Sequence, residues 1–262
     1  MAGLVTYEQW LWAFSIAVEI ALFASMAVRK YYRSYPAFFS YIGVDLLQAG
    51  ALFAAYSYWG FNAPASEHFS WETQVVVLCA RAWAIAEICR HLLGQYAGIW
   101  ALARSILLFC AAAVASFSIY TAGWKWSKTV LAADTGLEFT IGVVLVVLFL
   151  FARYYEIVPE PTVRIVAIGF FLFSCFRVVN DTILQHSLAR YVEVWRLLGG
   201  LAFFASLTLW LSAFRKPVPA LVSGPALLPG EIYRTLAPQV NLRLRRLNDQ
   251  LSKLGSSRAR RS

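Results

Sequence analysis

Apolar residues occur in long runs up to residue 215, and short polar segments separate these runs. Seven of the runs approach the length of about 20 residues that an α-helix needs to cross the hydrocarbon core of a bilayer. The runs cover residues 8–28, 36–59, 73–93, 105–120, 129–152, 164–185 and 191–214. The pattern therefore predicts an all-α fold, a polytopic membrane protein with seven transmembrane helices.

Cationic residues between the predicted spans are divided unequally between the two sides of the membrane. One side holds seven of them and the other holds three. The larger group is Arg29, Lys30, Arg33, Arg90, Arg104, Arg153 and Arg164, and the smaller group is Lys125, Lys128 and Arg190. Because short cytoplasmic loops carry the excess of lysine and arginine, we expect the N-terminus outside and the C-terminus in the cytoplasm of an inner (plasma) membrane. The first span lacks the basic leader and cleavage site of a signal peptide.

Composition supports the same class of protein. Hydrophobic residues make up 60% of the 262 residues, charged residues make up only 14%, and the mean hydropathy is +0.61. A water-soluble domain of this size could not bury so much apolar surface, so the composition excludes a disordered chain and a secreted disulfide scaffold. The net charge of +9 arises mostly in the C-terminal part of the chain, because residues 215–262 hold ten bases and two acids. The basicity therefore belongs to the tail, and no nucleic acid is expected as a partner.

The chain divides into three segments. Residues 1–215 form the predicted bundle, residues 216–238 form a linker rich in proline and glycine, and residues 239–262 form a basic amphipathic helix and tail. The apolar positions of this helix follow a heptad spacing: Val240, Leu244, Leu247, Leu251 and Leu254. A helix of two heptads is only marginally stable by itself, so it requires a second copy of the chain, a cytoplasmic protein or an anionic lipid surface as a partner. The alternative is that this segment is simply a solvated end of the chain. Its basic residues, which favour anionic lipid, include Arg243, Arg245 and Arg246.

Two stretches of the sequence resemble a known group of proteins. The first is Arg29 followed by YPAFFSY at 35–41, and the second is EICRHLL at 87–93 followed by Tyr96, Ala97 and Gly98. Both are similar to uncharacterised seven-helix integral membrane proteins of the type common in acidobacteria. The resemblance covers most of residues 1–215 and implies a seven-helix topology in a bacterial inner membrane. It implies no catalytic residue, because that group has no established activity.

Ionisable residues inside the predicted spans are the most informative polar feature. Each costs about 2.5–3.5 kcal/mol at the centre of a spanning helix, so such residues face the bundle interior and find partners. We expect a ligand pocket in the outer half of the bundle from Arg81, Asp134, Glu138, Arg177, Asn180, Asp181 and Arg196. Asp134 and Glu138 share a helical face, and Arg177 can pair with Asp181 in the same way. The alternative is a purely structural network of ion pairs that fixes the helix register.

Glu19 and Asp45 lie near the middle of the first and second spans, with no obvious local partner. One interpretation is a path for protons or cations, because intramembrane carboxyls commonly serve that purpose. The other is that both side chains are protonated and hydrogen-bonded to the backbone or to Gln48. Glu87 is expected to reach Arg90 or His91, which follow it on the same helix.

The usual motifs of catalysis and cofactor binding are missing from the sequence. No lysine lies between Lys128 and Lys216 to hold a retinal, and the four cysteines show no CxxC spacing. No phosphate-binding glycine loop, HExxH motif or GxSxG motif occurs. No cofactor, metal site or catalytic residue is predicted, and an enzyme is disfavoured.

Three functions remain open at this point. The preferred one is a receptor-like or sensor module with a polar pocket, which signals or docks through its basic tail. The second is a transporter coupled to protons or cations through the intramembrane carboxyls. The third is an accessory subunit whose charges are purely structural and which could form a homo-oligomer.

Overall fold

The described part of the chain folds into helices joined by short turns and contains no strand. The computed structural model describes residues 6–60, 63–94, 96–123, 125–157, 159–186, 192–215, 242–243 and 245–250, without the side chains at 6–9, 12, 97, 180–186 and 192–196. The helices are α1 (Thr6–Val28), the short 3-10 helix η1 (Tyr31–Arg33), α2 (Pro36–Trp59), α3 (Pro64–Leu93), α4 (Ala97–Ala122), α5 (Trp126–Tyr154), α6 (Pro161–His186) and α7 (Val192–Ala213).

Two of these helices begin much earlier than their hydrophobic runs predict. The α3 helix begins at Pro64, where the apolar run starts at 73, and α4 begins at Ala97, where the run starts at 105. The first turns of α3 are polar, and proline at the first helical position and a hydrogen bond from Ser66 Oγ to the Gly60 carbonyl (2.7 Å) stabilise its start. The length of an apolar run therefore underestimates the length of the helix, because a helix continues past the run wherever its backbone groups find hydrogen-bond partners.

Four described helical segments are long and apolar enough to cross a membrane. They are Pro36–Trp59, Gly98–Ala122, Trp126–Tyr154 and Pro161–Val179. The described side chains of α1 and α7 include the apolar segments Ala13–Val28 and Leu197–Ala213, each of which begins directly after residues without described side chains, and α3 has a more polar composition. Large apolar side chains also lie exposed on the outer surface, among them Leu108, Phe109 and Phe117 of α4. Such a surface suits contact with lipid, so the helices support a membrane protein.

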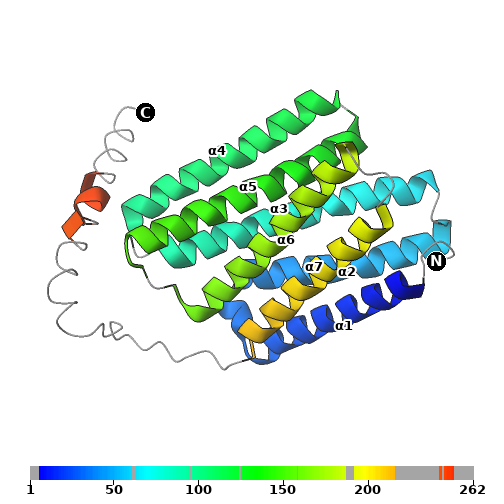
Figure 1. The fold of residues 1–262 in the computed structure, drawn as a ribbon, viewed down its shortest axis with the longest axis horizontal. Helices are drawn as coiled ribbons and strands as arrows, with labels where there is room; N and C mark the ends of the chain where they lie inside the picture. The colour runs from blue at the N-terminus through cyan, green and yellow to red at the C-terminus, as the bar shows by residue number, and fades with distance from the viewer. Residues whose placement is uncertain are drawn as a thin grey trace.

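The long helices lie side by side and run alternately in opposite directions (Figure 1). Each helix packs against its neighbour in the sequence, and α7 packs back against α1, which closes the bundle. The α3 helix takes the most central position, because it packs against α2, α4, α5 and α6. Polar side chains on α3 can therefore be reached from several helices at once.

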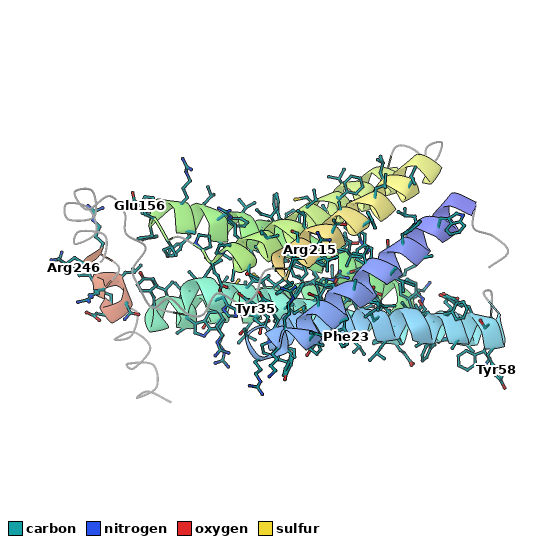
Figure 2. All side chains as sticks on the ribbon, turned by 90° about the horizontal axis from the view of Figure 1, so that it is seen from below. Phe23, Tyr35, Tyr58, Glu156, Arg215 and Arg246 are labelled. Atoms are coloured by element: carbon teal, nitrogen blue, oxygen red, sulfur yellow. The ribbon has the colours of Figure 1, made fainter. Side chains whose placement is uncertain are left out.

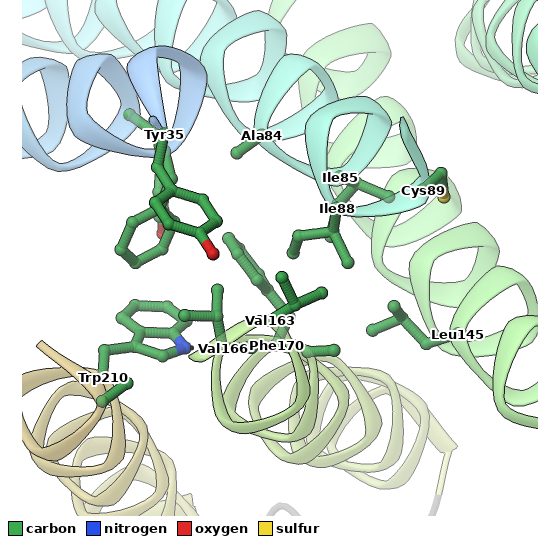
Figure 3. Close-up of a cluster of buried hydrophobic side chains, with 14 of the residues drawn as sticks. Tyr35, Ala84, Ile85, Ile88, Cys89, Leu145, Val163, Val166, Phe170 and Trp210 are labelled. Atoms are coloured by element: carbon green, nitrogen blue, oxygen red, sulfur yellow. Dashed lines mark hydrogen bonds between the residues drawn. The ribbon is translucent and has the colours of Figure 1, made fainter. Parts of the chain in front are cut away.

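An aromatic core joins α2, α6 and α7. The rings of Phe38, Phe170, Trp210 and Phe214 are fully buried, and Phe38 stacks on Phe214 with the ring centroids 5.6 Å apart. Figure 3 shows Trp210 of α7 turned toward α6, where its indole N–H donates to the Val166 carbonyl at 3.0 Å. A buried tryptophan needs such an acceptor, because its N–H would otherwise be left without a hydrogen bond in apolar surroundings.

Gly169 makes this indole position possible, because a Cβ atom at residue 169 would collide with the Trp210 ring. We predict that Gly169→Ala lowers the free energy of unfolding by about 1–3 kcal/mol, the usual cost of overpacking a filled core. Gly142→Ala is the matched control, because the nearest atom to a new Cβ there is Cys175 Sγ at 4.0 Å. Thermal unfolding of both variants in detergent checks the prediction, and equal melting temperatures would contradict it.

Candidate functional site

A buried arginine on the central helix lies between two carboxylates of α5. Arg81 Nη1 is 3.3 Å from Asp134 Oδ1 and also donates to Glu138 Oε1. All three residues are at most 4% exposed. Asp134 and Glu138 are four residues apart, so one face of α5 presents both carboxylates to the same guanidinium. The predicted neighbourhood of Arg81, Asp134 and Glu138 is therefore present in the structure.

The α6 helix completes this cluster with two further groups. Arg177 Nη2 pairs with the second carboxylate oxygen of Asp134, and the Ser174 hydroxyl donates to Glu138 Oε2. The Phe173 ring lies against both guanidinium groups, 5.3 Å from Arg81 and 5.9 Å from Arg177. Two arginines and two acids balance in charge, which is the condition under which buried charges are tolerated in a low-dielectric interior. We call Arg81, Asp134, Glu138, Ser174 and Arg177 the charge cluster.

A pair of carboxyls from α1 and α2 adjoins the charge cluster. Glu19 and Asp45 form a side-chain hydrogen bond with each other, and Asp45 lies close enough to Arg81 for electrostatic attraction. Ionised carboxylates only accept hydrogen bonds, so a hydrogen bond between two carboxyls requires that one of them carries a proton. Two carboxyls this close can therefore share one proton beside Arg81.

Gln48, one of the hydrogen-bond partners considered for these carboxyls, bonds to another helix. The Gln48 amide donates instead to Thr73 Oγ1 at 3.3 Å and to Gln74 Oε1 at 3.1 Å, both on α3. Gln48 therefore lies at the interface between α2 and α3.

Four buried polar atoms around the charge cluster have no hydrogen-bond partner among the described residues. They are Glu19 Oε1, Tyr41 OH, Arg81 Nε and Arg177 Nε. These atoms come from α1, α2, α3 and α6, and the Tyr41 ring lies 5.7 Å from the Arg81 guanidinium. A buried polar group without a partner costs about 1–3 kcal/mol, so such atoms point to water or a small polar molecule between the helices.

The remaining predicted pocket residues are only partly described. Asn180 and Asp181 lie on α6 and Arg196 lies on α7, but their side chains fall outside the described residues. Arg177, for which Asp181 is the predicted partner, is paired with Asp134 on the neighbouring helix. Sequence reasoning missed Ser174 and Tyr41. The spacing of three residues between Ser174 and Arg177 was a usable signal, because it places both on one face of α6.

A second polar contact lies where α2 begins, and it joins residues of the segments 35–41 and 87–93. The two carboxylate oxygens of Glu87 accept hydrogen bonds from the N–H groups of Ala37 and Phe38, at 3.1 and 2.9 Å. The expectation that Glu87 reaches Arg90 or His91 is therefore wrong. The first N–H groups of a helix lack partners within the helix and attract an anion, and Glu87 lies opposite them across the α2–α3 interface.

Tyr35 strengthens the same junction with α3 and links it to the start of α6. Its ring stacks on His91 with the centroids 4.6 Å apart, and its hydroxyl donates to Glu160 Oε2 at 3.0 Å, just before α6. Burial, together with the neighbouring Glu160 carboxylate, raises the pKa of Tyr35 above its ordinary value. The hydroxyl therefore stays protonated and keeps its role as a donor.

The described part of the tail lies at the start of α4. Asn248 Oδ1 accepts a hydrogen bond from the Gly98 N–H at 2.6 Å, and Leu247 packs against the hydrophobic core. Arg243, Arg245 and Arg246 are exposed. The linker at 216–238 and the other heptad positions, Val240, Leu244, Leu251 and Leu254, lie outside the described residues.

Among the described residues, no group of three histidine, cysteine, aspartate or glutamate side chains is placed to hold a metal ion. Comparisons with family models, curated proteins and solved structures give no match to this chain.

The charge cluster predicts a specific pattern of stability. Arg81→Met leaves Glu138 buried without its cation and should cost about 3–5 kcal/mol. The double variant Arg81→Met/Glu138→Met removes both charges and leaves the Asp134–Arg177 pair, so it should regain most of that loss. Arg153→Met, at an exposed position near the end of α5, is the control and should change stability by less than about 0.5 kcal/mol. Thermal unfolding in detergent measures all three, and a double variant no more stable than Arg81→Met would contradict the pairing.

Proposed function

We propose that this chain is a receptor-like or sensor protein of the inner membrane, with seven spans, the N-terminus outside and the C-terminus in the cytoplasm. Its ligand site is the polar interior around the charge cluster, and it signals or docks through its basic tail. The alternating direction of the seven helices and the excess of cationic loop residues at one end support this topology.

The observation that carries the proposal is the set of four unpartnered polar atoms. Three of them are on groups that can donate, Tyr41 OH, Arg81 Nε and Arg177 Nε, and the fourth is a carboxyl oxygen of Glu19. The cluster itself is balanced in charge, so the site favours an uncharged or zwitterionic molecule rich in hydrogen-bond acceptors over a simple anion. Asn180, Asp181 and Arg196 are further candidates to line this site.

Arg177 is the group through which such a ligand would act. Its side chain is 34% exposed, whereas the other charged members of the cluster are almost completely buried. A ligand acceptor that competes with Asp134 for this guanidinium would weaken the contact between α5 and α6. Because a ligand shifts an equilibrium only through a difference in affinity between two states, this exchange of partners supplies the difference that a sensor needs.

A second candidate is a transporter coupled to protons, and the Glu19–Asp45 contact favours it. A proton shared between these two carboxyls beside Arg81 would be a chemically reasonable carrier site. Proton uptake by proteoliposomes that is lost in Asp45→Asn would favour this function, whereas wild-type vesicles without any proton flux would eliminate it.

We predict that a small polar compound stabilises the wild-type protein against heat and that Arg177→Gln removes this effect. The variant keeps the fold more readily than Arg81 variants, because Arg177 is the most exposed charged member of the cluster. The measurement is a thermal-shift screen of amino acids and hexoses in detergent. Arg153→Gln, an exposed arginine outside the cluster, should retain the response of the wild type. A compound that stabilises both variants equally would place its site elsewhere, and a screen without a stabilising compound would count against the sensor function.

A further inference from the structure

The tail contributes a cap to a helix that it does not belong to. Gly98 lies in the first turn of α4, where the backbone N–H groups have no partner within the helix. The N-cap residue Tyr96 makes no side-chain hydrogen bond to them, and Asn248 supplies the missing acceptor at 2.6 Å. Asparagine is one of the residues preferred for this purpose, so the contact holds the tail at a defined point of the bundle.

An apolar contact accompanies this hydrogen bond. Leu247, adjacent to Asn248, is partly buried against the hydrophobic core of the bundle. Leu247 is the apolar heptad position of the tail that the structure describes, and it contacts the helical bundle of this same chain. The bundle therefore provides a partner that the short amphipathic helix requires, at the level where α4 begins.

Docking brings the arginines of the tail to one end of the molecule. Arg243, Arg245 and Arg246 are all exposed, and Figure 2 shows Arg246 at the same end as Glu156 and opposite Tyr58. The bundle adds further exposed arginines there, in the last turn of α3, the second turn of α4 and the last turn of α5: Arg90, Arg104 and Arg153. Exposed cations from the tail and the bundle therefore gather around the start of α4.

We propose that the docked tail and this end of the bundle together form a binding surface for anionic lipid headgroups. Gly98 lies in a helix that is long and apolar enough to cross the membrane, before its apolar run begins at residue 105, so the docking point lies on the headgroup side of the hydrocarbon. Arginines held at this depth meet lipid phosphates directly, and Leu242, which is 52% exposed beside them, suits the acyl boundary. The inference rests on the cytoplasmic tail of the proposed function and names anionic lipid as its partner.

The test is native mass spectrometry of the full chain in detergent, titrated with phosphatidylglycerol or phosphatidylcholine. Arg243→Gln/Arg246→Gln should weaken binding of phosphatidylglycerol roughly tenfold to thirtyfold and leave phosphatidylcholine binding unchanged. Lys125→Gln/Lys128→Gln removes the same charge from two exposed residues near the start of α5, at the opposite end, and should have no such effect. Equal phosphatidylglycerol binding by the wild type and the arginine variant, or an equal loss in the lysine variant, would overturn the proposal.

Asn248→Ala separates docking from charge. The variant keeps every arginine but should increase hydrogen–deuterium exchange in the first turn of α4, and unchanged exchange would reject the docked tail. Wild-type dimers that dissociate in Leu247→Ala would assign the seam to a second copy and also overturn the proposal. Lipid binding in detergent does not depend on membrane orientation, whereas C-terminal reporter fusions test that orientation alone. Failure of the lipid-binding proposal can therefore be distinguished from failure of the proposed cytoplasmic location of the tail.

Discussion

Pairing of charge in a low-dielectric interior is the constraint on which the rest of this structure depends. Arg81 lies on the most central helix, where an unpaired guanidinium would be very costly. Asp134 and Glu138 of α5 neutralise it, and Arg177 of α6 pairs with the remaining oxygen of Asp134. Three helices are thereby fixed relative to one another by side chains that have no comparable partner in lipid. A change of hydrogen-bond partner in this cluster would therefore alter the contacts between several helices at once.

The backbone N–H groups at the starts of the helices also need hydrogen-bond partners inside the protein. The first turn of α2 is capped by Glu87 from α3, and the first turn of α4 is capped by Asn248 from the tail. In both cases the acceptor comes from another element, because the residue before the helix provides no side-chain hydrogen bond. The caps tie helix starts to their neighbours, so ordering of the tail and packing of the bundle are physically connected.

The hydrophobic pattern predicted the helices well, because lipid-facing helices must be apolar along most of their length. The spacing of Asp134 and Glu138 also predicted their common face, because that relation is local to one helix. The pairing of Arg177 with Asp134 and the caps supplied by Glu87 and Asn248 could not be predicted, because each depends on which helices become neighbours. The α3 helix shows a related limit, since its first polar turns lie outside any hydrophobic run and nevertheless continue the helix from Pro64.

An experimental density map of the protein in lipid nanodiscs would show directly how the buried charges are paired. We predict that the Arg81 guanidinium lies between Asp134 and Glu138, and that non-protein density lies within hydrogen-bond distance of Tyr41 OH and Arg177 Nε. Such density would represent water or a small polar molecule held by the atoms that lack partners among the described residues. A map in which Arg81 faces lipid, or in which side chains of the chain itself fill all of this space, would contradict this prediction.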